Sequence, residues 1–530
     1  MLLGGIFFPA NVAAQKNGTG AWRDFDCVAR SEAWLSGYNA SGLTRLPNSV
    51  QTISIAEIFA NKSDGEFINY SQSNNSFTFG AQTESFFRLS NKTVLYGKVD
   101  YKNFTGQNMG GSAFINPDYN AFNIDELGAA ARGEKSLEQY GLIGAIGVNL
   151  SPRLSLGGKV DYLTANYAKH KDLRHKNSLL DLTATIGAAY QLTGAIEVGA
   201  NYIYRRSVES IEFDIYGNTD QVYSPLIDFG AFYGRTELFG ESGYTKDKLP
   251  VFNQFNGAAL QVNLKIKQNL GFFNEFSYLS RSGQYGTQTT SVTSVTYTEH
   301  KGTVMAYSGV LSFIQKQNQH LLKINLNNDQ LTNWENIFMR QNTPGGLSET
   351  IYLGKTQVLD RNRTTAGLEY TAQLNVQDYC PEWLLKVGAN FDNRRQTVSL
   401  YPYFRKQNIY SWNSYLFANK NITSEKNQYG ISLKFLYGSG GGDVYNDGLY
   451  ATPSDDLHQP VSSDYNLYRE YEYLTANRIA GNIGCSYSRI INRGLRGYVH
   501  IEYGLTKAFD IKNLDGSQFG SANLSIGCNF

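Results

Sequence analysis

Near the end of the chain, a histidine and a glutamate lie two residues apart, where they could do acid–base chemistry. His500 and Glu502 belong to an alternating segment, so their side chains share a face, and the carboxylate could orient the imidazole for a neighbouring serine. No nucleophile motif lies nearby, and the six histidines have no zinc-site spacing. A simple ion pair is the favoured interpretation. We predict that the protein is not an enzyme and has no cofactor.

Acidic residues gather in a glycine-rich stretch that begins at residue 438. The candidate calcium ligands are Asp443, Asp447, Asp455 and Asp456. Carboxylates on a flexible loop could bind Ca²⁺, but this spacing matches no defined site, so a solvated acidic loop is favoured and no metal is predicted. The glycines of GSGGGD (438–443) precede a predicted loop and not a helix, which argues against a phosphate-binding loop.

Other charged side chains lie where apolar and polar residues alternate along the chain. The lumen-facing candidates are Lys98, Asp100, Lys159, Asp161, Glu197, Arg205, Lys265, Lys323, Glu369, Lys386, Arg496, His500 and Glu502. In an open pore, such charges would tune solute selectivity. In a closed barrel, they would pair with each other or with a plug. Their mixed signs leave both alternatives open.

The alternating segments predict strands with a different solvent on each side. The last ten residues, SANLSIGCNF, place Leu524, Ile526 and Phe530 on one face and small polar residues on the other. Similar segments of about ten residues, the length of a tilted strand that crosses a bilayer, recur from residue 50 onward. The strands of a soluble sandwich, the alternative, are usually ~5–6 residues long.

The connections between these segments favour the membrane alternative. Short links alternate with long ones, and the long ones are expected at about 106–137, 214–252, 334–350 and 438–466. Short turns on one side and long loops on the other are typical of outer-membrane barrels. We predict an all-β fold, a transmembrane antiparallel barrel of about 18 strands; 14 or 16 strands remain open.

The overall composition narrows the class of protein further. The chain has 530 residues and a net charge of +1, from 47 basic and 46 acidic residues, so there is no electrostatic basis for binding nucleic acid. The 37 tyrosines and 30 phenylalanines argue against disorder. No stretch approaches the ~20 apolar residues of a membrane helix.

The N-terminal region divides into two parts ahead of a barrel at 50–530. Residues 1–14 fit a signal peptide, and the lack of Lys or Arg before its apolar core would fit a truncated start. Residues 15–49 do not alternate, although 29–35 could form a short helix. This segment is expected either to hang outside the barrel or to fold into the lumen as a plug.

Two of the four cysteines could be joined if the N-terminal segment folds back to the barrel. Cys27 lies in that segment, and Cys380 lies in a predicted turn at the same end of the barrel. A disulfide between them would form in an oxidising compartment. Two free thiols are the alternative.

Three stretches resemble known outer-membrane barrels. The final strand, which ends on Phe530, resembles the last strand of Gram-negative barrels, where the terminal aromatic is read by the assembly machinery. The stretch WRDFDCVARSEAWLSGYNASGL (22–43), with the Tyr-rich strands, resembles uncharacterised barrels of Bacteroidota. NASGL (39–43) is similar to the Asn-Pro-Ala-Gly-Leu signature of long-chain fatty acid transporters, from which it departs at Ala40 and Ser41. These resemblances imply the barrel fold and a location in the cell outer membrane.

We expect a channel or transporter for a small solute, gated by the N-terminal segment or the surface loops. The alternative is a non-transporting accessory barrel that docks another outer-membrane or surface protein through its loops; it predicts a filled lumen and an apolar or Tyr-rich loop surface. The expected partners are the lipid bilayer, the assembly machinery and, in the alternative, another outer-membrane protein.

Overall fold

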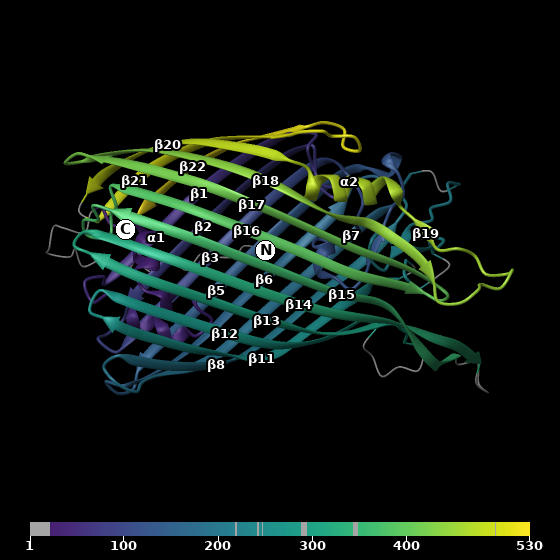
Figure 1. Ribbon diagram of the computed structural model, residues 1–530, viewed down its shortest axis with the longest axis horizontal. Coiled ribbons are helices and arrows are strands. Elements are labelled where there is room, and N and C mark those ends of the chain that lie inside the picture. The colour runs from purple at the N-terminus through teal and green to yellow at the C-terminus, as the bar shows by residue number, and fades with distance from the viewer. Residues whose placement is uncertain are drawn as a thin grey trace, which may run out of the picture.

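The chain forms one closed barrel of eighteen antiparallel strands, which confirms the predicted fold (Figure 1). The computed structural model describes residues 22–217, 220–240, 243–245, 247–287, 294–342, 348–492 and 494–530. The predicted signal peptide at 1–14 lies outside these residues, as does the start of the segment 15–49. Pairing of the last barrel strand with the first, with Asn529 opposite Ile55, closes the wall.

Each barrel strand pairs with its neighbours in chain order. The strands are β1 (Thr52–Gly65), β2 (Asn75–Arg88), β3 (Thr93–Met109), β5 (Gly133–Asn149), β6 (Leu154–Lys169), β7 (Arg174–Gln191), β8 (Ile196–Asp214), β11 (Leu249–Lys267), β12 (Leu270–Gly286), β13 (Thr296–Gln315), β14 (Asn318–Asn342), β15 (Ser348–Leu374), β16 (Trp383–Leu400), β17 (Tyr403–Thr423), β18 (Asn427–Leu449), β20 (Arg478–Asn492), β21 (Leu495–Ala508) and β22 (Gln518–Asn529).

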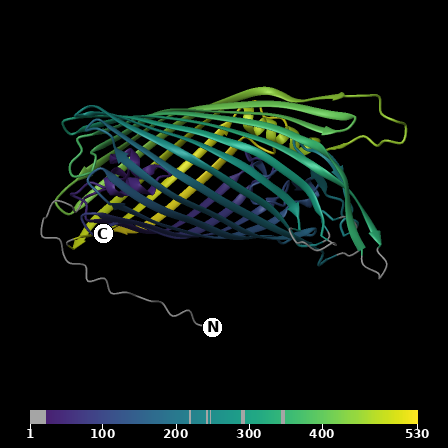
Figure 2. The same ribbon diagram turned by 90° about the horizontal axis from the view of Figure 1, so that it is seen from below.

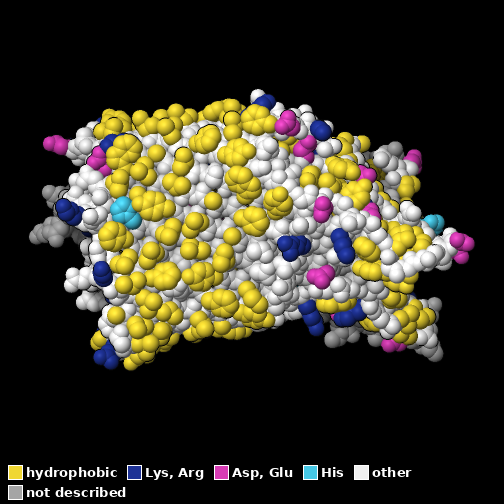
Figure 3. All heavy atoms as spheres, viewed as in Figure 1, with side chains coloured by type: hydrophobic (Ala, Val, Ile, Leu, Met, Phe, Trp, Pro, Cys, Tyr) yellow, Lys and Arg dark blue, Asp and Glu magenta, His cyan; other side chains and the backbone are white. Residues whose placement is uncertain are grey.

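Apolar side chains cover the outer face of the wall. Leu142, Val160 and Ile186 are examples, and the side chain of Ile186 is 69% exposed. Hydrophobic side chains spread over much of the barrel wall, whereas charged side chains gather towards the two ends (Figure 3). An apolar belt of this extent fits lipid better than water. In the described part of the chain, no helix is long and apolar enough to cross a membrane.

The two ends of the barrel differ in their connections. Short turns join the strands at one end, which we call the turn end; β1 begins there and β22 ends there. The longer connections lie at the opposite end, which we call the loop end. The predicted asymmetry between short and long connections is therefore present, because the three longest connections, at 110–132, 215–248 and 450–477, all lie at the loop end.

At the loop end, the connections form structure of their own. A second, four-stranded sheet contains β4 (Asn123–Asp125), β9 (Leu226–Asp228), β10 (Tyr233–Thr236) and β19 (Val461–Ser462). The helix α2 (Asp464–Thr475) and two 3₁₀ turns, η3 (Pro117–Tyr119) and η4 (Ala129–Ala131), accompany it. The loop expected at 438–466 was wrong at its end, because residues 464–475 form the helix α2, which buries polar side chains such as Asn466 and Glu470, and β20 begins only at Arg478.

One predicted loop, at 334–350, was also wrong. The strand β14 continues to Asn342, and β15 begins at Ser348, so most of this stretch is a paired hairpin. The expected strands end at the length that a bilayer requires, but a strand can continue beyond the membrane where its neighbour still pairs with it. The hairpin β14–β15 projects from the loop end (Figure 1).

The described part of the N-terminal segment folds into the barrel at the turn end. It contains α1 (Phe25–Ser31), η1 (Ala33–Ser36) and η2 (Ala40–Arg45), which lie within the wall in both ribbon views (Figures 1 and 2). The helix begins four residues before the expected range 29–35. The side chain of Asp24 caps it by accepting a hydrogen bond from the Cys27 amide, and Glu32, in extended conformation, ends it.

Candidate functional site

The N-terminal segment closes the turn end through contacts with strands on several sides of the lumen. Asn39 Nδ2 donates to the Ala188 carbonyl at 2.9 Å and to Gln261 Oε1 at 3.0 Å. The ring of Trp34 packs edge-on against Phe273, with centroids 5.1 Å apart. These contacts tie η1 and η2 to β7, β11 and β12.

Two of the lumen-facing candidates, Glu197 and Arg496, bind the same segment through their charged side chains. Glu197 accepts hydrogen bonds from Arg45, and Arg496 donates to the backbone carbonyls of Trp22 and Arg23 at 3.1 and 3.2 Å. On the side of β1–β3, Phe25 stacks on Phe86 with centroids 5.3 Å apart. The segment therefore spans the lumen from β2 to β12, which gives it the position of a plug.

The cysteines considered for a disulfide are free thiols in this structure. The side chain of Cys27 is 1% exposed, and its Sγ donates to Gln373 Oε1 at 2.8 Å. Cys380 Sγ accepts from Gln428 Nε2 at 3.2 Å. Burial raises the pKa of the Cys27 thiol to about 12, so this thiol stays protonated at neutral pH. The bridge considered between Cys27 and Cys380 is not formed in this structure, where each sulfur hydrogen-bonds to a different glutamine.

Several candidate charges form pairs on the inner face of the wall, three to five residues from the turn-end termini of their strands. Lys98 Nζ lies 3.8 Å from Glu84 Oε2, and Lys386 Nζ lies 3.7 Å from Glu369 Oε1. The side chains of these four residues keep 22–29% of their surface exposed, although they face inward. The wall at this height therefore borders open solvent space and not a packed core.

Five other candidates form no ion pair or side-chain hydrogen bond with any residue that the structure describes. They are Asp100, Lys159, Asp161, Lys265 and Lys323. Their strand positions have the same parity as the paired charges, so they add both signs to the lumen wall.

His500 and Glu502 lie close together on the inner face of β21, as expected. His500 Nε2 is 4.0 Å from Glu502 Oε2, and the strand register places Ser486 and Ser525 on either side of the histidine. No hydrogen bond joins either hydroxyl to the imidazole in the described chain. A nucleophile activated by this histidine would need that bond.

The four calcium candidates do not come together. They are Asp443, Asp447, Asp455 and Asp456. A register shift in the β17–β18 pair leaves Asp443 opposite Asn408, whereas Asp447 is opposite Arg405 and binds it at 2.7 Å. Such a bulge turns the two carboxylates to opposite faces of the sheet. The other two candidates follow β18 in the loop, and the described residues contain no group of three or more metal-ligand side chains. The GSGGGD stretch itself is part of β18, not the approach to a loop.

At the loop end, arginines from four strands surround the tip of the β3–β5 connection. We call them the arginine clasp: Arg205 (β8), Arg281 (β12), Arg361 and Arg363 (β15) and Arg394 (β16). The tip is η3, which carries Asp118 and Tyr119.

The tip residues contact the arginine clasp directly. The guanidinium carbons of Arg281 and Arg205 lie 4.5 and 5.1 Å from the centre of the Tyr119 ring. Asp118 lies 3.9 Å from both Arg363 and Arg394. The loop end is thereby closed by polar contacts at the tip, beneath the apolar core of the loops.

Of the five arginines, only Arg205 is among the residues predicted from the sequence to face the lumen. A signal for two others was present, because Arg361 and Arg363 have the same parity as Glu369, which was assigned to the polar face. The strand register supplies what was missing: Phe255 pairs with both Arg205 and Arg281, so these residues form one row across three strands.

The comparisons with known proteins concern the family and the general likeness of the chain. No curated protein matches it. Among solved structures, the ferric preacinetobactin receptor BauA from Acinetobacter baumannii has 9% identity over 90% of this chain and 80% of that chain, with a TM-score of 0.42. The copper transporter OprC has 8% identity over 90% and 80%, with a TM-score of 0.38. The monoaromatic hydrocarbon channel TodX, as a deletion mutant, has 9% identity over 94% and 93%, with a TM-score of 0.31.

At these TM-scores, no inference about this chain rests on the solved structures. The family comparison is of a different kind, because it matches residues 43–530, which include every strand of the barrel. The chain belongs to DUF6850, a family of unknown function.

Proposed function

We propose that the protein is an outer-membrane transporter whose lumen is closed at both ends at rest. The solute path would run through the barrel, with the turn end towards the periplasm and the loop end towards the outside. The observation that carries this proposal is the solvent-exposed, charged inner wall between the N-terminal segment and the loops, which cover the two ends of the lumen. A barrel with a purely mechanical function would not need charged side chains that face water inside it.

The N-terminal segment and the loops are the proposed gates. Polar contacts dominate where each meets the solvent-filled middle: Asn39 and Arg45 at the turn end, Asp118 at the loop end. Such contacts can exchange for water at a modest net cost, since the net free energy of a hydrogen bond in a protein is about 0.5–1.5 kcal/mol.

Single-channel conductance in a planar bilayer tests this function. The intact protein is compared with a variant that lacks residues 16–50 and with one that also replaces residues 112–131 by a short Gly-Ser linker. Heat-modifiable mobility on gels confirms that each barrel is folded. We expect silence from the intact protein and steady current from the double variant. Steady current from the intact protein would contradict the closed state, and silence from the folded double variant would contradict the solute path.

A second function, docking of another surface protein, is favoured by one observation. The projecting hairpin β14–β15 carries exposed apolar side chains near its tip, among them Ile337, Met339 and Leu353. Purification from the native membrane with and without I337S/L353S tests it. A partner lost only from the variant, together with a silent double variant in the bilayer, would favour the accessory barrel.

A further inference from the structure

The arginine clasp holds more binding capacity than the protein itself uses. The side chain of Arg281 is 1% exposed, and its Nη1 has no hydrogen-bond partner in the described chain. Arg361, also buried, makes no hydrogen bond or ion pair with any described residue, although Asp329 lies near it. The Tyr119 hydroxyl is buried without a partner as well. Unpaired donors of this kind carry a free-energy cost that an added acceptor would relieve.

Charge balance in the arginine clasp depends on the loops. Around the five arginines, the barrel wall supplies only three carboxylates, Asp181, Asp329 and Asp392. Loop elements supply three more: Asp118 in η3, Glu470 in α2, which binds Arg394, and Asp228 in β9, which faces Arg394. If η3 leaves, the arginine clasp loses one negative charge and the Tyr119 ring at once, while the ring of Phe255 on β11 remains against Arg205 and Arg281.

The tip occupies the arginine clasp in the way that a ligand would. Asp118 presents a carboxylate between Arg363 and Arg394, and Tyr119 presents a ring between Arg205 and Arg281. Both Asp118 contacts are long, at 3.9 Å, and its side chain is half exposed. Bidentate arginine–carboxylate pairs are shorter, with N–O distances of about 2.7–2.9 Å. A free carboxylate could therefore bind more closely than the tethered one.

The tip can move without unfolding the loops. No residue of η3 is buried, whereas Phe114 and Phe122 on either side of it are anchored in the apolar core. Displacement is thus confined to at most the seven residues between these two fixed points, which keeps the tip close to the arginine clasp as an intramolecular competitor.

We propose that the arginine clasp is the binding site for an anionic aromatic solute, one that carries a carboxylate beside a ring, and that Asp118 and Tyr119 occupy this site in the closed state. Binding would displace η3 and open the loop end from within. This inference rests on the proposed transport function, because opening of the loop end has a consequence only in a transporter. The binding step itself can be measured without transport.

Titration calorimetry on the refolded full-length chain in detergent tests the site, with 4-hydroxyphenylacetate as the probe. Three proteins are compared: the wild type, D118A/Y119A with the site vacated, and D118A/Y119A/R361Q. The control R489Q in the vacated background removes an exposed arginine far from the arginine clasp. We expect the vacated protein to bind the probe at least about tenfold more tightly than the wild type, because a tethered competitor acts at about millimolar effective concentration. R361Q should lower that affinity at least about tenfold, and R489Q should leave it unchanged.

Each contrary outcome overturns a defined part of the proposal. No binding by the vacated protein, shown to be folded by gel mobility and circular dichroism, overturns the site. Equal affinity in the wild type and the vacated protein overturns occupancy by the tip. Equal binding of tyrosol, which has the same ring and no carboxylate, overturns the anion assignment. Failure of conductance with intact binding would count against the transport function alone.

Discussion

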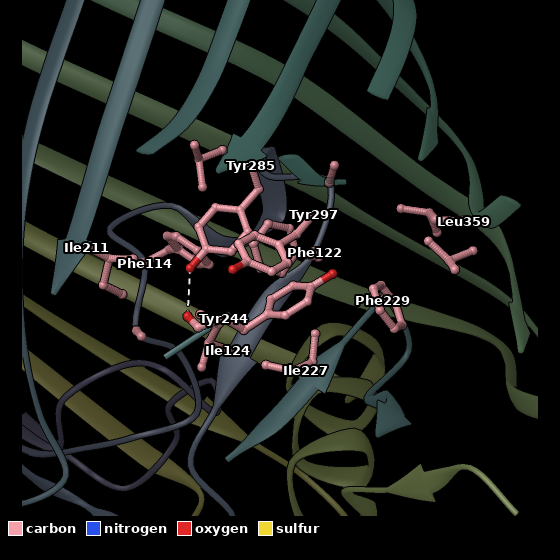
Figure 4. Packing of buried hydrophobic residues seen from close by; sticks show 14 of the residues in the cluster. Phe114, Phe122, Ile124, Ile211, Ile227, Phe229, Tyr244, Tyr285, Tyr297 and Leu359 are labelled. Atoms are coloured by element: carbon pink, nitrogen blue, oxygen red, sulfur yellow. Dashed lines mark hydrogen bonds between the residues drawn. The ribbon is translucent and has the colours of Figure 1, made fainter. Parts of the chain in front are cut away.

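The two ends of the lumen are closed in different ways. At the turn end, nine buried apolar side chains form the cluster that holds the N-terminal segment, and polar anchors such as Asn39 do much of the rest. At the loop end, 22 buried apolar side chains form a core between the loops and the strands (Figure 4). Tyr285, whose hydroxyl donates to the Tyr244 carbonyl at 2.7 Å, lies near its centre. Both counts refer to the described residues.

This difference suggests which closure can be released as a unit. Apolar burial contributes roughly 25 cal/mol per Å², so the larger core resists displacement as a body, and only its polar tip, η3, is free to move. The N-terminal segment has a smaller core and is held in part by hydrogen bonds that water can replace. We therefore expect the turn end to open by movement of the whole segment and the loop end by movement of the tip.

The largest effect is expected from truncation in the loop core. Phe122 packs against Phe114, Tyr244 and Tyr285 with centroids 4.8–5.8 Å apart. F122A should destabilise the closed loops by about 3–5 kcal/mol, because it removes a buried ring and leaves a cavity. Hydrogen exchange should then show loss of protection at 110–132 and 226–236 while the barrel strands stay protected. Phe509, exposed at the same end, is the matched control: F509A should leave protection unchanged, and equal effects of the two would refute the core's part in closure.

A smaller effect is expected at the turn end. N39A removes the hydrogen bonds that Asn39 Nδ2 donates to Ala188 and Gln261, and it should favour release of the segment by about 1–3 kcal/mol. Cys27 reports this release because it is buried when the segment is bound. In a protein whose other three cysteines are serine, the rate of maleimide labelling at Cys27 should rise about 5- to 150-fold.

The control for N39A is another lumen amide that does not contact the segment. Asn413 accepts a hydrogen bond from Asn390 on the opposite part of the wall. N413A should leave labelling of Cys27 at the wild-type rate. If N39A labels no faster than N413A, the apolar cluster alone holds the segment, and the contrast between the two ends disappears.

The loop end also contains a carboxyl group, that of Asp228, whose protonation should affect the closure of this end. Burial raises the pKa of Asp228 in the loop sheet to about 7, and Glu470 and Arg394 are the charges that face it. Since the closed state has the higher pKa, it binds the proton more tightly than the open state, and closure weakens as pH rises from about 4 to 7. Proteolysis of the loops should be about tenfold faster at pH 8 than at pH 5, equivalent to about 1.4 kcal/mol. D228N should remove most of this dependence; an unchanged pH profile in D228N would assign it to another group.

Much of the wall could be predicted from sequence, and the closures could not. Strands with lipid on one face and water on the other must alternate, so eighteen segments were recognisable, among them the one that ends at Phe530. Alternation does not mark where lipid ends, which is why β14 and β15 exceeded their expected lengths. It also does not show that β18 continues to Leu449, which is why Asp443 and Asp447 were expected in a loop.

The arginine clasp illustrates the remaining gap. Arg361 and Arg363 lie an even number of residues before Glu369, which indicates that they also face inward. This spacing does not show how far along the lumen each side chain lies. Their meeting with Asp118 depends on the register of several strands and on the fold of a connection that has no periodic pattern. Such contacts between distant segments are set by packing, which a single sequence does not display.

The smallest effect is expected on the charged inner wall between the two closures, where neither should matter. Lys386 and Glu369 keep 23% and 29% of their side-chain surface exposed, and such a pair contributes about 0–1 kcal/mol to stability. K386Q should therefore leave the unfolding midpoint nearly unchanged.

In the double variant with both gates removed, however, K386Q should shift the reversal potential towards cation selectivity, because Glu369 loses its neutralising partner. K98Q, which frees Glu84 on another part of the wall, should shift it in the same direction, and K316Q, in an exposed turn, should not. Identical reversal potentials in all three variants would mean that ions do not pass this charged wall, and the solute path would have to lie elsewhere.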